Sequence, residues 1–95
     1  APNLLKTGKG NFQEMYQIKQ VILKNVKILG QSTFSMCHNL KTAILPKVEE
    51  IQDFCFSYCF QLNYVEADEL KTIGKGSFKE GTAKIYAPKF GESYG

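Results

Sequence analysis

Apolar and polar positions alternate along this chain in a pattern that repeats every 22 residues. Phe12, Phe34, Phe56 and Phe78 mark the period. The apolar side chains that follow each phenylalanine at the same distance are Ile18, Leu40 and Leu62 at six residues, Val21, Ala43 and Val65 at nine, Leu23, Leu45 and Ala67 at eleven, Val26, Val48 and Leu70 at fourteen, and Leu29, Ile51 and Ile73 at seventeen. Such a period predicts a solenoid, in which each repeat buries its apolar face against its neighbours.

One short segment of each repeat alternates with period two and is expected to form a strand. We expect strands within Ile18–Lys24, at Ala43–Leu45, at Val65–Ala67 and at Ile85–Ala87. Stacked repeats place equivalent residues about 4.8 Å apart, so these strands should form a parallel sheet on one face. The phenylalanine segments, expected as short turns or one-turn helices, should build the opposite face.

The same period predicts how a single domain covering residues 1–95 is divided. We expect a half repeat at 4–12 and three full repeats at 12–33, 34–55 and 56–77. A terminal repeat at 78–90 is two residues short, and a glycine-bounded tail at 91–95 is expected to fray.

Two segments resemble one family. The run Ile73 to Phe78, I-G-K-G-S-F, resembles the I-G-x-x-A-F turn of BspA-like leucine-rich repeats, and Cys37 to Pro46 is similar to that family's C-x-x-L-x-x-V-x-L-P run. The resemblance covers about Leu5 to Tyr86. It departs at the small residue before each phenylalanine, which is not Ala but Asn11, Thr33, Cys55 and Ser77. The expected fold is a mainly β repeat solenoid, a short right-handed β-solenoid of leucine-rich-repeat type.

Composition narrows the possible partners. The chain is 43% hydrophobic and 22% charged, which indicates a folded protein. It has no apolar run near the ~18 residues that suggest a membrane span. The net charge of +3 comes from lysines that are scattered around the repeat, and the chain has no arginine. A basic stripe is the footprint of nucleic-acid binding, so we expect neither a nucleic-acid partner nor membrane insertion.

The cysteines suggest packing and not metal binding. Cys37 and Cys59 occupy the same slot in adjacent repeats, between Met15 and Gly81 in that column. We interpret them as buried soft residues, although a Cys37–Cys59 disulfide is sterically conceivable. With Cys55 in a different column and one histidine, the chain does not supply the four converging ligands of a zinc site. No metal or cofactor is expected.

The remaining candidates for chemistry have structural explanations. His38 is adjacent to Cys37, so the two side chains should point to opposite sides, and we expect an exposed surface histidine. The Gly-Lys-Gly runs at 8–10 and 74–76 lack the spacing of a phosphate loop, and positive φ explains their glycines. The acidic pairs at 49–50 and 68–69 are expected to be solvated, without the shielding that an acid catalyst needs. We therefore predict a non-enzymatic protein.

The outward positions of the sheet remain as the candidate site. The predicted protein-binding residues are Ile22, Ile44, Tyr64, Glu66 and Tyr86. A row of exposed isoleucine and tyrosine is typical of an interaction surface, although strand propensity alone could also place such residues there. The family resemblance implies a surface-exposed or secreted protein that adheres to host or matrix proteins. The alternative is a structural subunit that stacks head to tail into a filament, because the chain opens on the second half of a repeat and closes on the first half.

Overall fold

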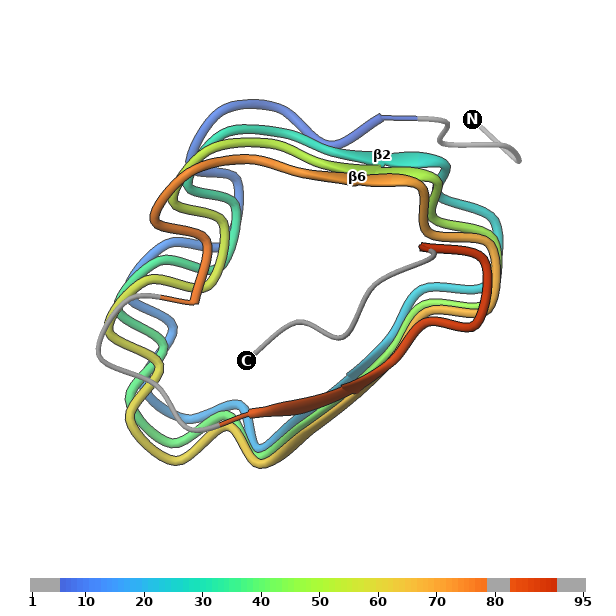
Figure 1. Ribbon diagram of the computed structural model, residues 1–95. Coiled ribbons are helices and arrows are strands. Elements are labelled where there is room, and N and C mark those ends of the chain that lie inside the picture. Colours follow the sequence, from blue (N-terminus) through green and yellow to red (C-terminus); the bar gives the residue numbers. More distant parts are fainter. Residues whose placement is uncertain (1–5, 79–82, 91–95) are drawn as a thin grey trace.

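The chain winds into stacked rungs, one for each repeat of the sequence (Figure 1). The structure is a computed structural model that describes residues 6–78 and 83–90. Within these residues the regular elements are all β-strands, which are joined by turns. The predicted repeat solenoid is therefore confirmed.

The larger sheet is the one that the alternating segments predicted. It consists of β1 (Gln20–Ile22), β3 (Thr42–Ile44), β5 (Tyr64–Glu66) and β7 (Lys84–Tyr86), all parallel and in that order. β1 lies within the predicted segment Ile18–Lys24, and β3, β5 and β7 each begin and end one residue earlier than predicted. The difference arises because alternation marks the inward side chains and not the first ladder bond. The hydrogen bonding still continues past the strand ends: the Leu45 N–H, for example, donates to the Glu66 carbonyl at 2.7 Å.

A second, smaller sheet was not predicted. It contains β2 (Ile28–Leu29), β4 (Glu50–Ile51) and β6 (Thr72–Ile73), again parallel, and Lys6 bridges to Ile28 at its edge. The expectation that the phenylalanine turns alone build the face opposite the larger sheet is therefore wrong. The turns form the side that joins the two sheets (Figure 1).

The last repeat keeps its strand register although it is short. Tyr64 pairs with Lys84, 20 residues on, whereas Thr42 pairs with Tyr64, 22 residues on. The change in length therefore falls between Phe78 and Ala83, and residues 79–82 lie outside the described part of the chain. So do Gly81 of the cysteine column, Leu4 of the first half repeat and the tail at 91–95.

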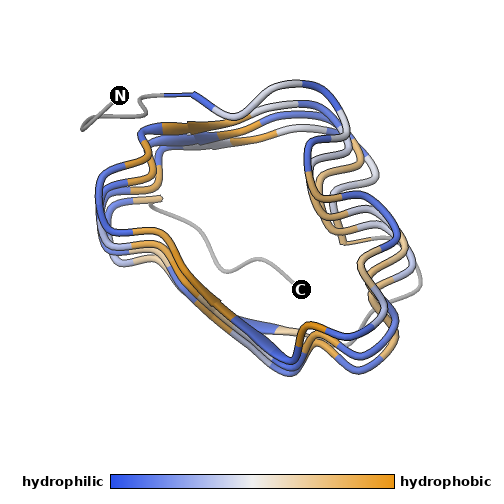
Figure 2. Ribbon diagram, turned by 180° about the vertical axis from the view of Figure 1, so that it is seen from behind, coloured by the Kyte–Doolittle hydropathy of each residue, from blue (hydrophilic) through white to orange (hydrophobic). Residues whose placement is uncertain are grey.

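The core consists of columns of identical or similar side chains, one from each rung. Figure 2 shows hydrophobic residues at the same places in successive rungs. The phenylalanine rings form a ladder with centroid separations of 5.3, 5.4 and 5.4 Å from Phe12 to Phe78. Phe34 and Phe56 are each 1% exposed, so the prediction that they are fully buried is confirmed.

The turn that precedes each phenylalanine requires a left-handed residue. Gly10 and Gly76 have φ of 64° and 65°, which confirms the reason predicted for these two glycines. Gly8 and Gly74 do not have a positive φ, so the same prediction is wrong for them. Ser32 and Phe54 occupy the same slot with φ of 57° and 59°. Neighbouring rungs hold this conformation, since the Phe54 N–H donates to the Lys75 carbonyl at 3.0 Å.

The polar residues before the phenylalanines satisfy buried carbonyl groups. The Thr33 hydroxyl donates to the Gly30 carbonyl at 2.7 Å, and the Ser77 hydroxyl lies 2.8 Å from the Gly74 carbonyl. Thr33 and Ser77 are both fully buried. These hydroxyls give the two carbonyls a hydrogen bond that an alanine at the same position could not supply.

Candidate protein-binding face

The outward side of the larger sheet presents a column with one side chain from each strand. Ile22 pairs with Ile44, Ile44 with Glu66, and Glu66 with Tyr86. Ile22 is 51% exposed and Tyr86 50%, while Ile44, Glu66 and the neighbouring Tyr64 are half-buried. Their inward neighbours Ala43 and Val65 are fully buried, so the predicted residues lie together on the solvent side. We call these five residues, Ile22, Ile44, Tyr64, Glu66 and Tyr86, the sheet face.

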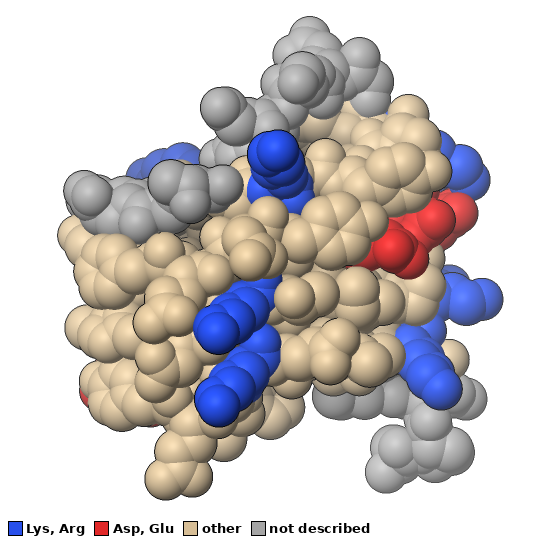
Figure 3. Space-filling model, turned by 90° about the horizontal axis from the view of Figure 1, so that it is seen from below, with Lys and Arg blue, Asp and Glu red and all other residues tan. Residues whose placement is uncertain are grey.

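The sheet face combines apolar, aromatic and acidic groups. The Tyr64 hydroxyl donates to Glu66 Oε1 at 3.2 Å. Burial raises the pKa of Tyr64, and the hydrogen bond to Glu66 and the charge of nearby Asp68 raise it further. Figure 3, which views this side of the molecule, shows acidic side chains gathered toward one edge, with lysines distributed around a largely uncharged surface.

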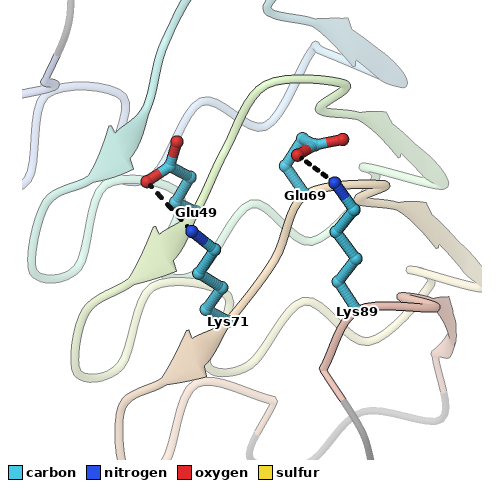
Figure 4. Close-up of polar contacts among 4 residues, drawn as sticks. All are labelled: Glu49, Glu69, Lys71 and Lys89. Carbon is cyan, nitrogen blue, oxygen red and sulfur yellow. Dashed lines mark hydrogen bonds and ion pairs between the residues drawn. The ribbon is translucent and has the colours of Figure 1, made fainter.

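Two columns of alternating charge lie at the corner after the larger sheet. One column contains Lys27, Glu49 and Lys71, and the Lys71 ammonium lies 4.0 Å from Glu49 (Figure 4). In the other, Lys89 Nζ donates to Glu69 Oε1 at 2.8 Å (Figure 4). This hydrogen bond lowers the pKa of Glu69, which is the opposite of what a general acid requires.

Burial corrects part of the expectation for the acidic pairs. Glu50 lies in β4 and is half-buried, and Asp68 is half-buried with a buried Oδ1 atom. Glu50 also accepts a hydrogen bond from the Gln52 amide at 3.4 Å. These two residues are therefore more shielded from water than predicted, and Glu50 lies in a strand and not in the expected turn.

The structure adds an exposed aromatic column that the sequence analysis missed. Tyr16, His38 and Phe60 stack through successive rungs, with centroid separations of 5.1 and 5.0 Å. His38 is half-buried between the two rings, so the expectation of an exposed histidine is wrong. Tyr16 and Phe60 are 43% and 53% exposed. The 22-residue spacing of these three rings was the available signal.

The cysteines are buried and unpaired. Cys37, Cys55 and Cys59 are free thiols with at most 1% exposure, which confirms the packing interpretation of the Cys37–Cys59 column. Cys59 Sγ lies 3.1 Å from the Phe34 carbonyl, and Cys37 Sγ is 3.1 Å from the Phe12 carbonyl. Burial raises the pKa of Cys59 to about 12 and also raises the pKa of Cys37 and Cys55. A nucleophilic cysteine needs a lowered pKa, so that it is a thiolate near neutral pH.

Two further observations concern metal binding and membrane insertion. In residues 6–78 and 83–90, no group of three or more His, Cys, Asp or Glu side chains is arranged to hold a metal ion. None of the described segments forms a helix with the length and apolar character needed to cross a bilayer.

These features define a leucine-rich-repeat β-solenoid with a mixed apolar and acidic outward face. The family model for the BspA type leucine rich repeat region (6 copies) matches residues 2–91. The chain belongs to this family, whose members are typically non-enzymatic protein-interaction modules associated with surface or secreted proteins. Neither the curated proteins nor the solved structures gave a significant match.

Proposed function

We propose that this chain is a non-enzymatic adhesion module, at the cell surface or secreted, that binds a host or matrix protein through the sheet face. The observation behind the proposal is the row of side chains that cross all four strands, with Ile22 and Tyr86 at its two ends each about half exposed. Exposed apolar and aromatic side chains on a rigid sheet lose little conformational freedom on binding, and aromatic anchors favour protein interfaces.

The backbone supports this role. Each strand of the larger sheet is hydrogen-bonded to its neighbours, and fully buried residues such as Ala43 and Val65 lie beneath the face. A partner therefore meets an ordered surface, and most of its binding free energy should come from a few central side chains.

The experiment measures binding of the chain to a panel of purified extracellular-matrix and serum proteins by surface plasmon resonance. For any partner found, Ile44→Asp should weaken binding at least tenfold, because it places a charge in the middle of the face. The matched control is Ile28→Asp, the same change at a half-buried isoleucine in the smaller sheet. Equal losses from both variants would remove the reason for choosing the sheet face.

The aromatic column is the competing surface, and a second pair of variants separates the two. Tyr86→Ala removes an exposed ring from the sheet face, and Tyr16→Ala removes one from the aromatic column. The proposal requires that Tyr86→Ala weaken binding and that Tyr16→Ala leave it unchanged. The reverse result would move the binding site to the aromatic column. Thermal unfolding of each variant identifies losses that are due to instability.

The second candidate function is head-to-tail stacking into a filament. It is favoured by a hollow of about 260 Å³ on the first-rung side, lined by apolar side chains that include Phe12, Met15 and Ile22. A further rung could cover this surface, and the edge of β1 offers a template for another parallel strand. Such a contact between copies is heterologous and forms a filament unless its rotation closes. Light scattering over increasing concentration tests this candidate, and a monomer at high micromolar concentration would exclude it.

A further inference from the structure

The sheet face ends in two carboxylates that lie beside two tyrosines. Glu66 follows Tyr64 at the next outward position of β5, and Tyr86 of β7 pairs with Glu66. Asp68 lies two residues beyond Glu66, close enough for its charge to raise the pKa of Tyr64, after the larger effects of burial and of Glu66. Four side chains from two neighbouring rungs thus form one acidic and aromatic corner of the face.

In the described part of the chain, no lysine forms an ion pair with the two carboxylates of this corner. The two ion pairs present there join Glu49 to Lys71 and Glu69 to Lys89, and neither includes Glu66 or Asp68. Glu66 accepts one hydrogen bond, from the Tyr64 hydroxyl. Within residues 6–78 and 83–90, the buried Oδ1 atom of Asp68 has no hydrogen-bond partner. A buried carboxylate oxygen without a partner costs free energy, and a cation that contacts the rest of the Asp68 carboxyl group would offset part of this cost through its charge.

The other end of this column of outward side chains is apolar and uncharged. Ile22 and Ile44 lie in the same column as Glu66, one strand apart at each step. Strand spacing of about 4.8 Å places Ile22 roughly 10 Å from Glu66 along the axis of the solenoid. A ligand that matches the whole column therefore needs an apolar group and a cation separated by about that distance.

We infer that the sheet face recognises a segment of a partner protein that places an arginine side chain against Glu66 and Asp68 and an apolar side chain over Ile22. This inference rests on the proposed function and names the chemistry of its partner. A guanidinium group donates several hydrogen bonds in one plane, which suits two neighbouring carboxylates, and its flat face packs on tyrosine rings such as Tyr86. A calcium ion would require six to eight oxygen ligands, more than this corner offers.

The probe is the short peptide acetyl-Leu-Pro-Pro-Arg-amide. Its two prolines favour the polyproline II conformation, in which side chains three residues apart lie on the same side and about 9.3 Å apart. The matched control peptide has citrulline in place of arginine, which keeps the shape and removes the charge. Binding is followed by heteronuclear NMR of the intact chain, and the backbone amides of β1, β3, β5 and β7 report on the face.

The arginine peptide should shift resonances of the larger sheet and bind at least tenfold more tightly than the citrulline peptide. Its affinity should fall with added salt, because part of the binding is between charges. Glu66→Gln combined with Asp68→Asn should abolish this preference for arginine. The control pair Glu49→Gln and Glu50→Gln removes the same charge elsewhere and should retain the preference.

Three results would overturn the inference: equal affinity for the two peptides, an unchanged preference in the Glu66 and Asp68 variant, or equal shifts with calcium chloride alone. They are distinguishable from failure of the proposed function. If Ile44→Asp abolishes binding of a matrix protein while the two peptides bind alike, only the arginine inference fails. If the arginine peptide binds as expected while no matrix or serum protein depends on Ile44, only the adhesion proposal fails.

Discussion

Phe34 and Phe56 stack with their ring centroids 5.4 Å apart and their planes 9° from parallel. This separation is close to the strand spacing of about 4.8 Å and falls within the range of about 4.5–7 Å that is typical of aromatic pairs. Each ring thus packs against the equivalent ring of the next rung. The stability of the solenoid should depend on this ladder more than on any exposed ring.

The first prediction compares a buried and an exposed phenylalanine of the same repeat. Phe56→Ala should lower the free energy of unfolding by about 3–5 kcal/mol, because it removes a fully buried ring and leaves a cavity between two neighbours. Phe60→Ala, at a ring that is 53% exposed, is the control and should cost much less. Urea unfolding followed by circular dichroism measures both. Similar losses would show that the ladder does not dominate the core.

The second prediction concerns the thiols. Cys37, Cys55 and Cys59 should react with a disulfide reagent such as Ellman's reagent only as fast as the chain opens. All three are buried, and a pKa of Cys59 raised to about 12 leaves almost no thiolate near neutral pH. In concentrated urea all three should react at the rate of a free thiol. Fast reaction of Cys37 or Cys59 in the native protein would contradict their placement in the core.

The third prediction compares two glycines of one column. A Cβ at Gly74 would lie 2.5 Å from the Asp53 backbone nitrogen and 2.7 Å from the Gln52 carbonyl carbon, where the backbone cannot easily move. Gly74→Ala should therefore cost about 1–3 kcal/mol, as is usual for overpacking. The equivalent Cβ at Gly8 would meet only the flexible side chain of Asn11.

Gly8→Ala is thus the control, and its unfolding transition should differ little from that of the parent chain. Thermal unfolding of both variants provides the comparison. A Gly74→Ala variant as stable as Gly8→Ala would mean that the rungs can separate locally at this corner without loss.

The fourth prediction tests the ion pair at the last described rung. The pKa of Glu69 lies below its ordinary value of 4.5 because Lys89 donates a hydrogen bond to it. A depressed folded pKa means that the pair stabilises the protein above pH 4.5 and that this contribution is lost as the pH falls through the folded pKa. Lys89→Met should return the pKa of Glu69 toward 4.5.

Carboxyl-carbon NMR titration measures this shift directly. Lys9→Met removes the same charge far from the pair and should leave the pKa of Glu69 unchanged. An unaltered titration of Glu69 in Lys89→Met would show that the hydrogen bond is not formed in solution.

The period predicted most of the core, because a constant offset from Phe34 or Phe56 also gives a constant position in the stack. The smaller sheet was not predicted, because two-residue strands such as Ile28–Leu29 are too short to show an alternation of apolar and polar residues. The position of the His38 ring was not predicted, for a different reason. Whether its ring points to water or stacks on Tyr16 depends on the angle of the turn, which the order of apolar residues does not specify.

The sheet-face residues were predicted by alternation along single strands, but their arrangement depends on pairing between strands. Alternation places Tyr64 and Glu66 on the same side of β5, and only the register shows that Glu66 lies beside Tyr86. The buried oxygen of Asp68 has no sequence signal, because it depends on how closely the turn after β5 packs against its neighbours.

The shortened last repeat has a consequence for how such a protein can change over generations. Tyr64 and Lys84 stay paired although the chain between them is two residues shorter than between Thr42 and Tyr64. The difference in length lies outside the paired strands, so duplication or loss of a whole unit can leave the strand register of the other units unchanged. Each duplicated unit would lengthen the outward face by about 4.8 Å. Recombination between repeats can therefore tune the reach of the molecule in fixed increments without a new core having to evolve.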